Sequence, residues 1–296
     1  MRALVFVGAA TLGLIVGNTA GSQGSTRELL SIHRVGGNVY MIDPGSEGGG
    51  NITVLVGDDA LLLVDASGWV DPQPVLKALK GLSDKPVRYV VNTHCHRDHT
   101  AGNAAFQAAG ATIVAHTNLR RRVEAQKCDG EVALPTLSTD SKLTLHLDNE
   151  EVQVIALPAG HTDGDAMVYF KNANVLAAGD AFVSSELPSQ SRYAGGNMLG
   201  VNEELRRIVE LFPNDVKIVP GHGPQSAMSE VRGVLKVLDG IRDAVARQVS
   251  QGKSFDQLNE MNLLEPWKGV LGEAGPRYLH WYFDFLTGPP DPKYQL

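Results

Sequence analysis

One stretch of six residues constrains this chain more than any other feature, because it carries three imidazoles and a carboxylate. It follows an apolar stretch that predicts a buried strand over 87–92 and precedes a helix predicted over 100–109. A core cannot hold four such groups unless each finds a buried polar partner. In extended backbone, alternate residues point the same way and can converge on one point. The residues are His94, His96, Asp98 and His99, of which His99 faces a second point.

Imidazole and carboxylate groups without thiolates favour a catalytic rather than a structural zinc site. An exposed, solvated histidine-rich turn is the alternative interpretation of this segment alone. Three later strands, predicted over 151–157, 175–178 and 216–219, end beside a glycine and a further metal-binding residue. Those residues are His161, Asp180 and His222. Four strand ends that each present such a group indicate one site at one edge of the sheets.

The combined pattern closely resembles the metallo-β-lactamase superfamily, whose hallmark is His-x-His-x-Asp-His followed by single His, Asp and His residues at strand ends. The resemblance covers roughly residues 28–225 and implies an α/β fold, the four-layer αββα sandwich, with two zinc ions per chain. It implies that His94, His96 and His161 bind the first ion and that Asp98, His99 and His222 bind the second. Asp180 would bridge the two ions, and Asp65 would steady the ligand loop from behind.

A hydrolase follows from this resemblance. A hydroxide that bridges the two metals would attack a carbonyl of a small ester, lactone, thioester or amide-type substrate. Asp98 would be catalytic, positioning this nucleophile or passing on its proton. Zinc β-lactamases typically have Cys or Ser in place of Asp180, and the carboxylate-binding Lys of their commonest group is missing from 181–185. Hydrolysis of β-lactam antibiotics is therefore the alternative function, and an iron-dependent persulfide oxidoreductase of the same fold is a weaker one.

Substrate choice is expected to reside in two glycine-containing loops, 44–50 and 184–200, because the ligands are occupied with chemistry that many substrates share. The polar and aromatic side chains of the second loop are the candidate substrate contacts. These are Ser184, Ser185, Arg192, Tyr193 and Asn197.

The first residues predict export. Residues 1–17 have one Arg followed by an apolar run too short to span a bilayer comfortably, and polar, small residues follow. We interpret 1–22 as a signal peptide with an uncertain cleavage site, which predicts a periplasmic or secreted protein without a stable membrane anchor. An uncleaved anchor is the alternative. The net charge of −7 argues against a nucleic-acid partner and leaves a small-molecule substrate.

The 296 residues are expected to form a signal peptide, a metallo-β-lactamase domain over 28–225 and a helical extension over 226–296 packed on that domain. The extension contains helices predicted over 226–251 and 276–286. A run of three arginines at 120–122 is most simply a solvated helix face. Two cysteines, Cys95 and Cys128, cannot form a disulfide scaffold. A single disulfide between them is compatible with the sequence. The oligomeric state does not follow from the sequence.

Overall fold

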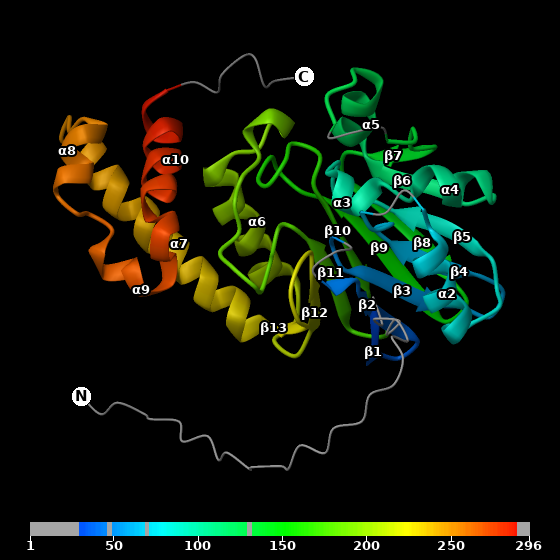
Figure 1. Cartoon of the computed structure of the whole chain (residues 1–296). Helices are drawn as coiled ribbons and strands as arrows, with labels where there is room; N and C mark the ends of the chain where they lie inside the picture. Colours follow the sequence, from blue (N-terminus) through cyan, green and yellow to red (C-terminus); the bar gives the residue numbers. More distant parts are fainter. Residues whose placement is uncertain (1–29, 46–48, 69–70, 129–131, 289–296) are drawn as a thin grey trace, which may run out of the picture.

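The computed structural model describes residues 30–45, 49–68, 71–128 and 132–288, which form two β-sheets and a set of surrounding helices (Figure 1). The predicted signal peptide lies outside the described residues, as does part of the 44–50 loop. The seven-stranded sheet has the strand order β1-β2-β3-β4-β5-β6-β7. Its strands are β1 (Ser31–Gly36), β2 (Val39–Asp43), β3 (Ile52–Val56), β4 (Leu61–Val64), β5 (Val87–Val91), β6 (Thr112–His116) and β7 (Leu137–Thr139).

The second sheet has six strands in the order β13-β12-β11-β10-β9-β8. These are β8 (Lys142–Leu147), β9 (Glu150–Ala156), β10 (Ala166–Phe170), β11 (Val175–Gly179), β12 (Lys217–Pro220) and β13 (Ser226–Ala227). The helices are α2 (Gln73–Leu82), α3 (Arg97–Thr100), α4 (Asn103–Ala108), α5 (Thr117–Glu124), α6 (Met198–Leu211), α7 (Met228–Val249), α8 (Phe255–Glu260), α9 (Lys268–Leu271) and α10 (Gly275–Thr287), with short 3-10 turns η1 (Arg192–Ala194), η2 (Glu265–Trp267) and η3 (Gly272–Ala274).

Three apolar clusters stack these elements into four layers. The middle cluster joins the inner faces of both sheets, for example Val91 of β5 and Val168 of β10. A second cluster packs α2 and α4 on the outer face of the seven-stranded sheet, through Leu79 and Phe106. The third packs α6, α7 and α10 on the outer face of the six-stranded sheet, with Tyr282 among its buried members. The expected αββα sandwich with C-terminal helices is therefore the architecture of the chain.

Strand direction brings the ligand-bearing strand ends to one edge. Strands β4, β5 and β6 are parallel neighbours, as are β11 and β12. Strand β9 runs antiparallel to β10, which runs antiparallel to β11, so β9 and β11 point the same way. Because strands of one direction end at one edge, the segments after β9, β11 and β12 emerge together.

Several element boundaries differ from the sequence expectation. The helix expected over 100–109 is two short helices, α3 and α4. Gly102 lies between them, against the carbonyl of Ala66, where a side chain would collide. Helix α6 starts at Met198 instead of 202, which ends the second substrate loop at Asn197. Strands β1, β7 and β13 were not expected, and β13 occupies the first two residues of the helix predicted over 226–251, which begins at Met228. Among the described residues, none of the helices combines the length and apolar character that crossing a membrane requires.

Candidate metal centre

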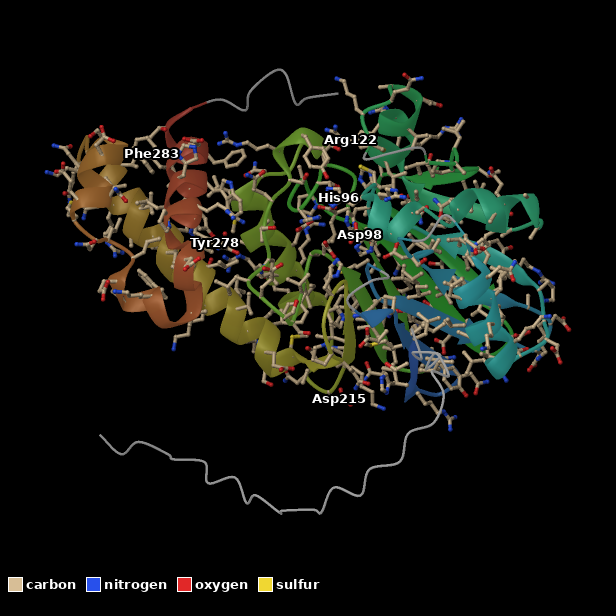
Figure 2. The ribbon with its side chains drawn as sticks, viewed as in Figure 1. His96, Asp98, Arg122, Asp215, Tyr278 and Phe283 are labelled. Atoms are coloured by element: carbon tan, nitrogen blue, oxygen red, sulfur yellow. The ribbon has the colours of Figure 1, made fainter. Side chains whose placement is uncertain are left out.

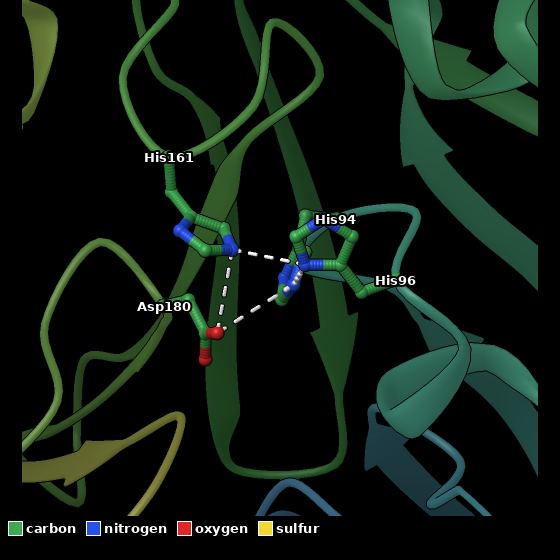
Figure 3. Close-up of side chains that lie close together, drawn as sticks. All are labelled: His94, His96, His161 and Asp180. Atoms are coloured by element: carbon green, nitrogen blue, oxygen red, sulfur yellow. Dashed lines mark hydrogen bonds and ion pairs between the residues drawn. The ribbon is translucent and has the colours of Figure 1, made fainter. Parts of the chain in front are cut away.

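Four ligand atoms converge from three separate segments of the chain (Figure 3). The Nδ1 atom of His96 lies 3.0 Å from Nε2 of His94 and 3.0 Å from Nε2 of His161. The Oδ2 atom of Asp180 lies 3.8 Å from Nε2 of His94 and 3.4 Å from Nε2 of His161. Ligands about 2.0–2.1 Å from a tetrahedral zinc ion lie roughly 3.3–3.4 Å apart, so these spacings suit such an ion.

A second group lies beside the first. The Oδ2 atom of Asp98 is 3.4 Å from Nε2 of His99 and 3.0 Å from Nε2 of His222, and the two Nε2 atoms are 3.3 Å apart. The Oδ1 atom of Asp180 faces this group, at 3.4 Å from His99 and 3.6 Å from His222. One carboxylate therefore presents one oxygen to each group. All seven residues that the sequence predicted as ligands lie in these two groups.

Hydrogen bonds to the other ring nitrogens fix which nitrogen of each histidine faces the centre. The ring of His96 donates from Nε2 to Ser191 Oγ (3.1 Å), which leaves Nδ1 as its ligand atom. His161 donates from Nδ1 to the carbonyl of Ser189 (2.7 Å). His94 donates from Nδ1 to Thr93 Oγ1 (3.0 Å). Such partners orient a ligating imidazole and raise its basicity.

Asp65 holds two segments of the site together from behind. Its Oδ2 accepts hydrogen bonds from Nδ1 of His99 and from Oγ1 of Thr93, each at 2.8 Å. Its Oδ1 accepts the backbone N–H of Thr93, also at 2.8 Å. Asp65 follows β4 and has a φ of 66°, a left-handed backbone conformation that residues other than glycine rarely adopt. Strain of this kind persists only where the surroundings enforce it, and here it aims a buried carboxylate at the ligand loop.

The electrostatics differ between the two groups. Burial and neighbouring histidines lower the pKa of His94, and burial lowers the pKa of His96 to about 3, so both rings are neutral at pH 7. In the second group, burial opposes charge, but the carboxylates of Asp180 and Asp65 raise the pKa of His99 above its usual value. A hydrogen bond to Asp98 raises the pKa of His222. The second group thus attracts positive charge, which a divalent cation would supply.

Two further observations fit the residues to metal ions. The Oδ1 atom of Asp180 is buried and, among the described residues, has no hydrogen-bond donor. A buried carboxylate oxygen without a donor is costly unless a cation contacts it. Gly221 follows β12 and lies so close to that oxygen that a side chain at position 221 would collide with it.

The site opens into a cavity of about 210 Å³ lined by ligands of both groups and by the segment after Asp180. This volume is below the ~300–1,000 Å³ of typical ligand pockets, which suits part of a small substrate. Its lining residues are His161, Asp180, Val183, Ser185, Glu186, Ser189 and His222.

The predicted substrate contacts are only partly placed at this cavity. Ser185 lines it, whereas the hydroxyl of Ser184 donates to the carbonyl of Pro224 (2.8 Å). Tyr193 is 48% exposed, and its ring centroid lies 5.4 Å from that of His96. Two of the candidates have partners within the protein. Asn197 caps α6 by accepting the backbone N–H of Leu199. Arg192 pairs with Asp284 of α10, which turns its charge toward that helix.

The prediction of a solvated helix face at 120–122 is wrong for one of its residues. The side chain of Arg122 is fully buried, and its guanidinium forms a bidentate pair with Asp163. Its guanidinium also donates to the carbonyl of Tyr193 at 3.3 Å (Arg122 is labelled in Figure 2). Cys95 points away from the ligands, as alternation predicted, and its thiol is hydrogen-bonded to Cys128.

Apart from Asp65, sequence reasoning missed the residues that support the ligands. Thr93 and Ser191 could have been found as hydroxyl residues adjacent to the motif or in the loop after Asp180. Glu204 of α6 carried no local indication, because its carboxylate reaches the backbone N–H of His161 across 43 positions.

Comparison with known proteins agrees with this geometry. Residues 34–222 match the family model of the metallo-beta-lactamase superfamily. The chain belongs to this superfamily. The matched range contains every ligand described above.

Two curated relatives are about a quarter identical to the chain over the aligned residues. A metallo-beta-lactamase type 2 from Bacillus sp. (strain 170) is 27% identical over 58% of this chain and 66% of the relative. A hydroxyacylglutathione hydrolase from Pelagibacter ubique (strain HTCC1062) is 26% identical over 52% of this chain and 59% of the relative. The chain thus spans less than two thirds of either protein. A solved metallo-beta-lactamase from Pontibacter korlensis has a TM-score of 0.62 at 20% identity, covering 71% of this chain and 99% of that one, which supports the fold.

Proposed function

We propose that this protein is an exported dizinc hydrolase that cleaves a small ester, lactone, thioester or amide-type substrate. The observation that carries the proposal is the pair of ligand groups that share Asp180. Its Oδ2 faces the first group and its Oδ1 faces the second. Their donor set of imidazoles and carboxylates, without thiolates, is that of a catalytic zinc site. When bound, the two metal ions would supply Lewis acidity toward a carbonyl and activation of a water molecule.

The chain's own residues would do the remaining work. His161, Asp180 and His222 line the cavity, so a substrate seated there reaches both ligand groups. The carboxylate of Asp98 has one oxygen in the second group and a second oxygen available to orient water or accept its proton. The hydroxyl of Ser185 also lines the cavity and can donate a hydrogen bond to substrate. No Ser or Cys nucleophile is required.

Export and the small-molecule partner belong to the same proposal. The apolar run over 1–17 supports export to the periplasm or medium, and the acidic net charge argues against nucleic acid as substrate. The relative named hydroxyacylglutathione hydrolase supports a thioester as one substrate class.

β-Lactam hydrolysis is the second candidate, supported by the relative named metallo-beta-lactamase type 2. Asp180 and the missing lysine in 181–185 count against it as the main activity. We therefore rank it below ester and thioester hydrolysis.

Metal analysis of the purified chain, followed by rate measurements on a panel of esters, thioesters, lactones and nitrocefin, tests the proposal. We expect about two zinc ions per chain and loss of hydrolysis on chelation. Asp180→Ala should lower metal content, whereas Cys95→Ala, a buried neighbour of two ligands that points away from them, should retain it. Stoichiometric iron with oxygen uptake on a persulfide substrate would refute the hydrolase in favour of an oxidoreductase.

A further inference from the structure

Two carboxylate residues line the cavity, Asp180 and Glu186, and the ligand set does not use the second. Glu186 lines it together with His161, Asp180 and His222. Asp98 and Asp180 belong to the ligand groups, but Glu186 does not. Among the described residues, no hydrogen bond or ion pair engages the Glu186 side chain, and none of the seven lining residues is Lys or Arg.

The backbone that carries Glu186 is held in place on both sides. The hydroxyl of Tyr278, a buried residue of α10, lies 2.8 Å from the carbonyl oxygen of Leu187 and 3.0 Å from that of Pro188 (Figure 2). The carbonyl of Ser189 accepts the Nδ1–H of His161. On the other side, Ser184 is bonded to Pro224. Glu186 therefore projects from a segment anchored to both α10 and the metal centre.

The arginine of the same loop does not neutralise this wall. The guanidinium of Arg192 pairs with Asp284 and lies 5.7 Å from the centroid of the Phe285 ring. Apart from the ligand Asp180, the carboxylate of Glu186 is thus the negative charge that the cavity wall presents to a bound substrate.

We propose that Glu186 is a specificity-determining residue that favours substrates with a positively charged ammonium group in this cavity over substrates with a carboxylate there. This inference rests on the proposed hydrolase function and names its substrate class. Its physical basis is Coulombic: a unit charge about 6 Å from Glu186 in water-like surroundings changes an affinity about threefold. A cation is favoured by that factor and an anion disfavoured by it, so the preference between them is about tenfold.

Three thioesters with the same acetyl group and different leaving groups test it. They are acetylthiocholine (cationic), S-ethyl thioacetate (neutral) and S-acetylmercaptoacetate (anionic), and released thiol is measured as kcat/KM. In Glu186→Gln we expect the ratio of the cationic to the anionic substrate to fall about tenfold, and in Glu186→Lys about 100-fold, with smaller effects at high salt. Glu273→Gln removes the same charge at an exposed position that does not line the cavity, and should leave the ratio unchanged.

Binding of the free thiols thiocholine and mercaptoacetate to the metal-loaded protein, measured by calorimetry, separates two kinds of failure. If no thioester is hydrolysed but the ratio of thiol affinities still falls in Glu186→Gln, the hydrolase proposal fails and the charge preference stands. If the wild type hydrolyses the neutral thioester and Glu186→Gln leaves both ratios unchanged at equal metal content, Glu186 does not select substrates. A wild-type preference for the anionic members would refute the inference as well.

Discussion

Replacement of Glu204 tests whether a buried pair of carboxyl groups supports the metal centre. Glu204 is fully buried on α6, and its Oε2 accepts the backbone N–H of His161 at 3.2 Å. Its Oε1 is buried and has no hydrogen-bond donor within the part of the chain that the structure describes, and the carboxyl of Asp165 is a close neighbour. Burial, then the charge of Asp165, raises the pKa of Glu204 well above its usual value. We therefore expect the two carboxyl groups to share one proton.

The expected magnitudes follow from these contacts. Glu204→Ala leaves the N–H of His161 without an acceptor and the carboxyl of Asp165 without its partner, each costing about 1–3 kcal/mol. The total loss of unfolding free energy is about 2–6 kcal/mol, or ~4–24 °C in Tm. Glu204→Gln should cost less than ~1 kcal/mol, because the amide oxygen accepts the N–H of His161 and the amide N–H replaces the shared proton.

The measurements are urea unfolding of the metal-free protein and zinc affinity by chelator competition. Zinc affinity should fall at least ~10-fold in Glu204→Ala and stay near normal in Glu204→Gln, because the glutamate acts through a ligand. Glu203→Ala is the matched control one position away, where the side chain forms only surface ion pairs with Arg206 and Arg207. If Glu204→Gln proved as damaging as Glu204→Ala, both carboxyls would be ionised around a cation, and the shared-proton explanation would be wrong.

Three other outcomes are expected. Asp65→Asn should lower metal affinity of the second group about 10–100-fold, measured by chelator competition, because Nδ1 of His99 loses a charged acceptor. Tyr278→Phe should raise KM at unchanged zinc content, since the segment carrying Glu186 loses its link to α10. Burial lowers the pKa of His116, whose ring accepts the N–H that starts α5. On acidification the unfolded state therefore binds the proton at a higher pH than the folded state. The free energy of unfolding should then fall below about pH 6.5 by up to ~1.4 kcal/mol per pH unit, as measured by urea unfolding. The variant His116→Asn still caps the helix and should lack this slope.

The ligand set could be predicted because its residues stand where apolar strands end. A run such as 175–178 identifies the strand, and the polar residue directly after it must lie at the sheet edge. The αββα fold followed from the family pattern, and every strand expected in 38–219 lies within a few positions of an observed one. Strand β1 could not be predicted, because four of its six residues are exposed and the strand lacks the alternation of apolar and polar residues that predicts a half-buried strand.

The partners of several polar side chains around the site could not be predicted, because they depend on contacts distant in the sequence. Arg192 was a candidate substrate contact on account of its loop position, and only the packing of α10 reveals Asp284 as its partner 92 positions later. Arg122 reads as part of a polar helix face, and its burial follows from Asp163 reaching back to it. Asn197 did carry a local indication, since asparagine before an apolar periodic segment is a frequent helix N-cap.

Helix α10 bears on a metal centre to which it contributes no ligand. Tyr278 holds the carbonyls next to Ser189, whose own carbonyl orients His161. Tyr282 donates a hydrogen bond to Asn202 at 2.6 Å on α6, the helix whose Glu204 accepts the backbone N–H of the same histidine. Two independent connections from one helix therefore end at the ring and at the backbone of one ligand. A packing change in the C-terminal helices is for this reason expected to reach the first ligand group before it reaches the second, whose histidines are held by Asp65 and Asp98 from the opposite sheet.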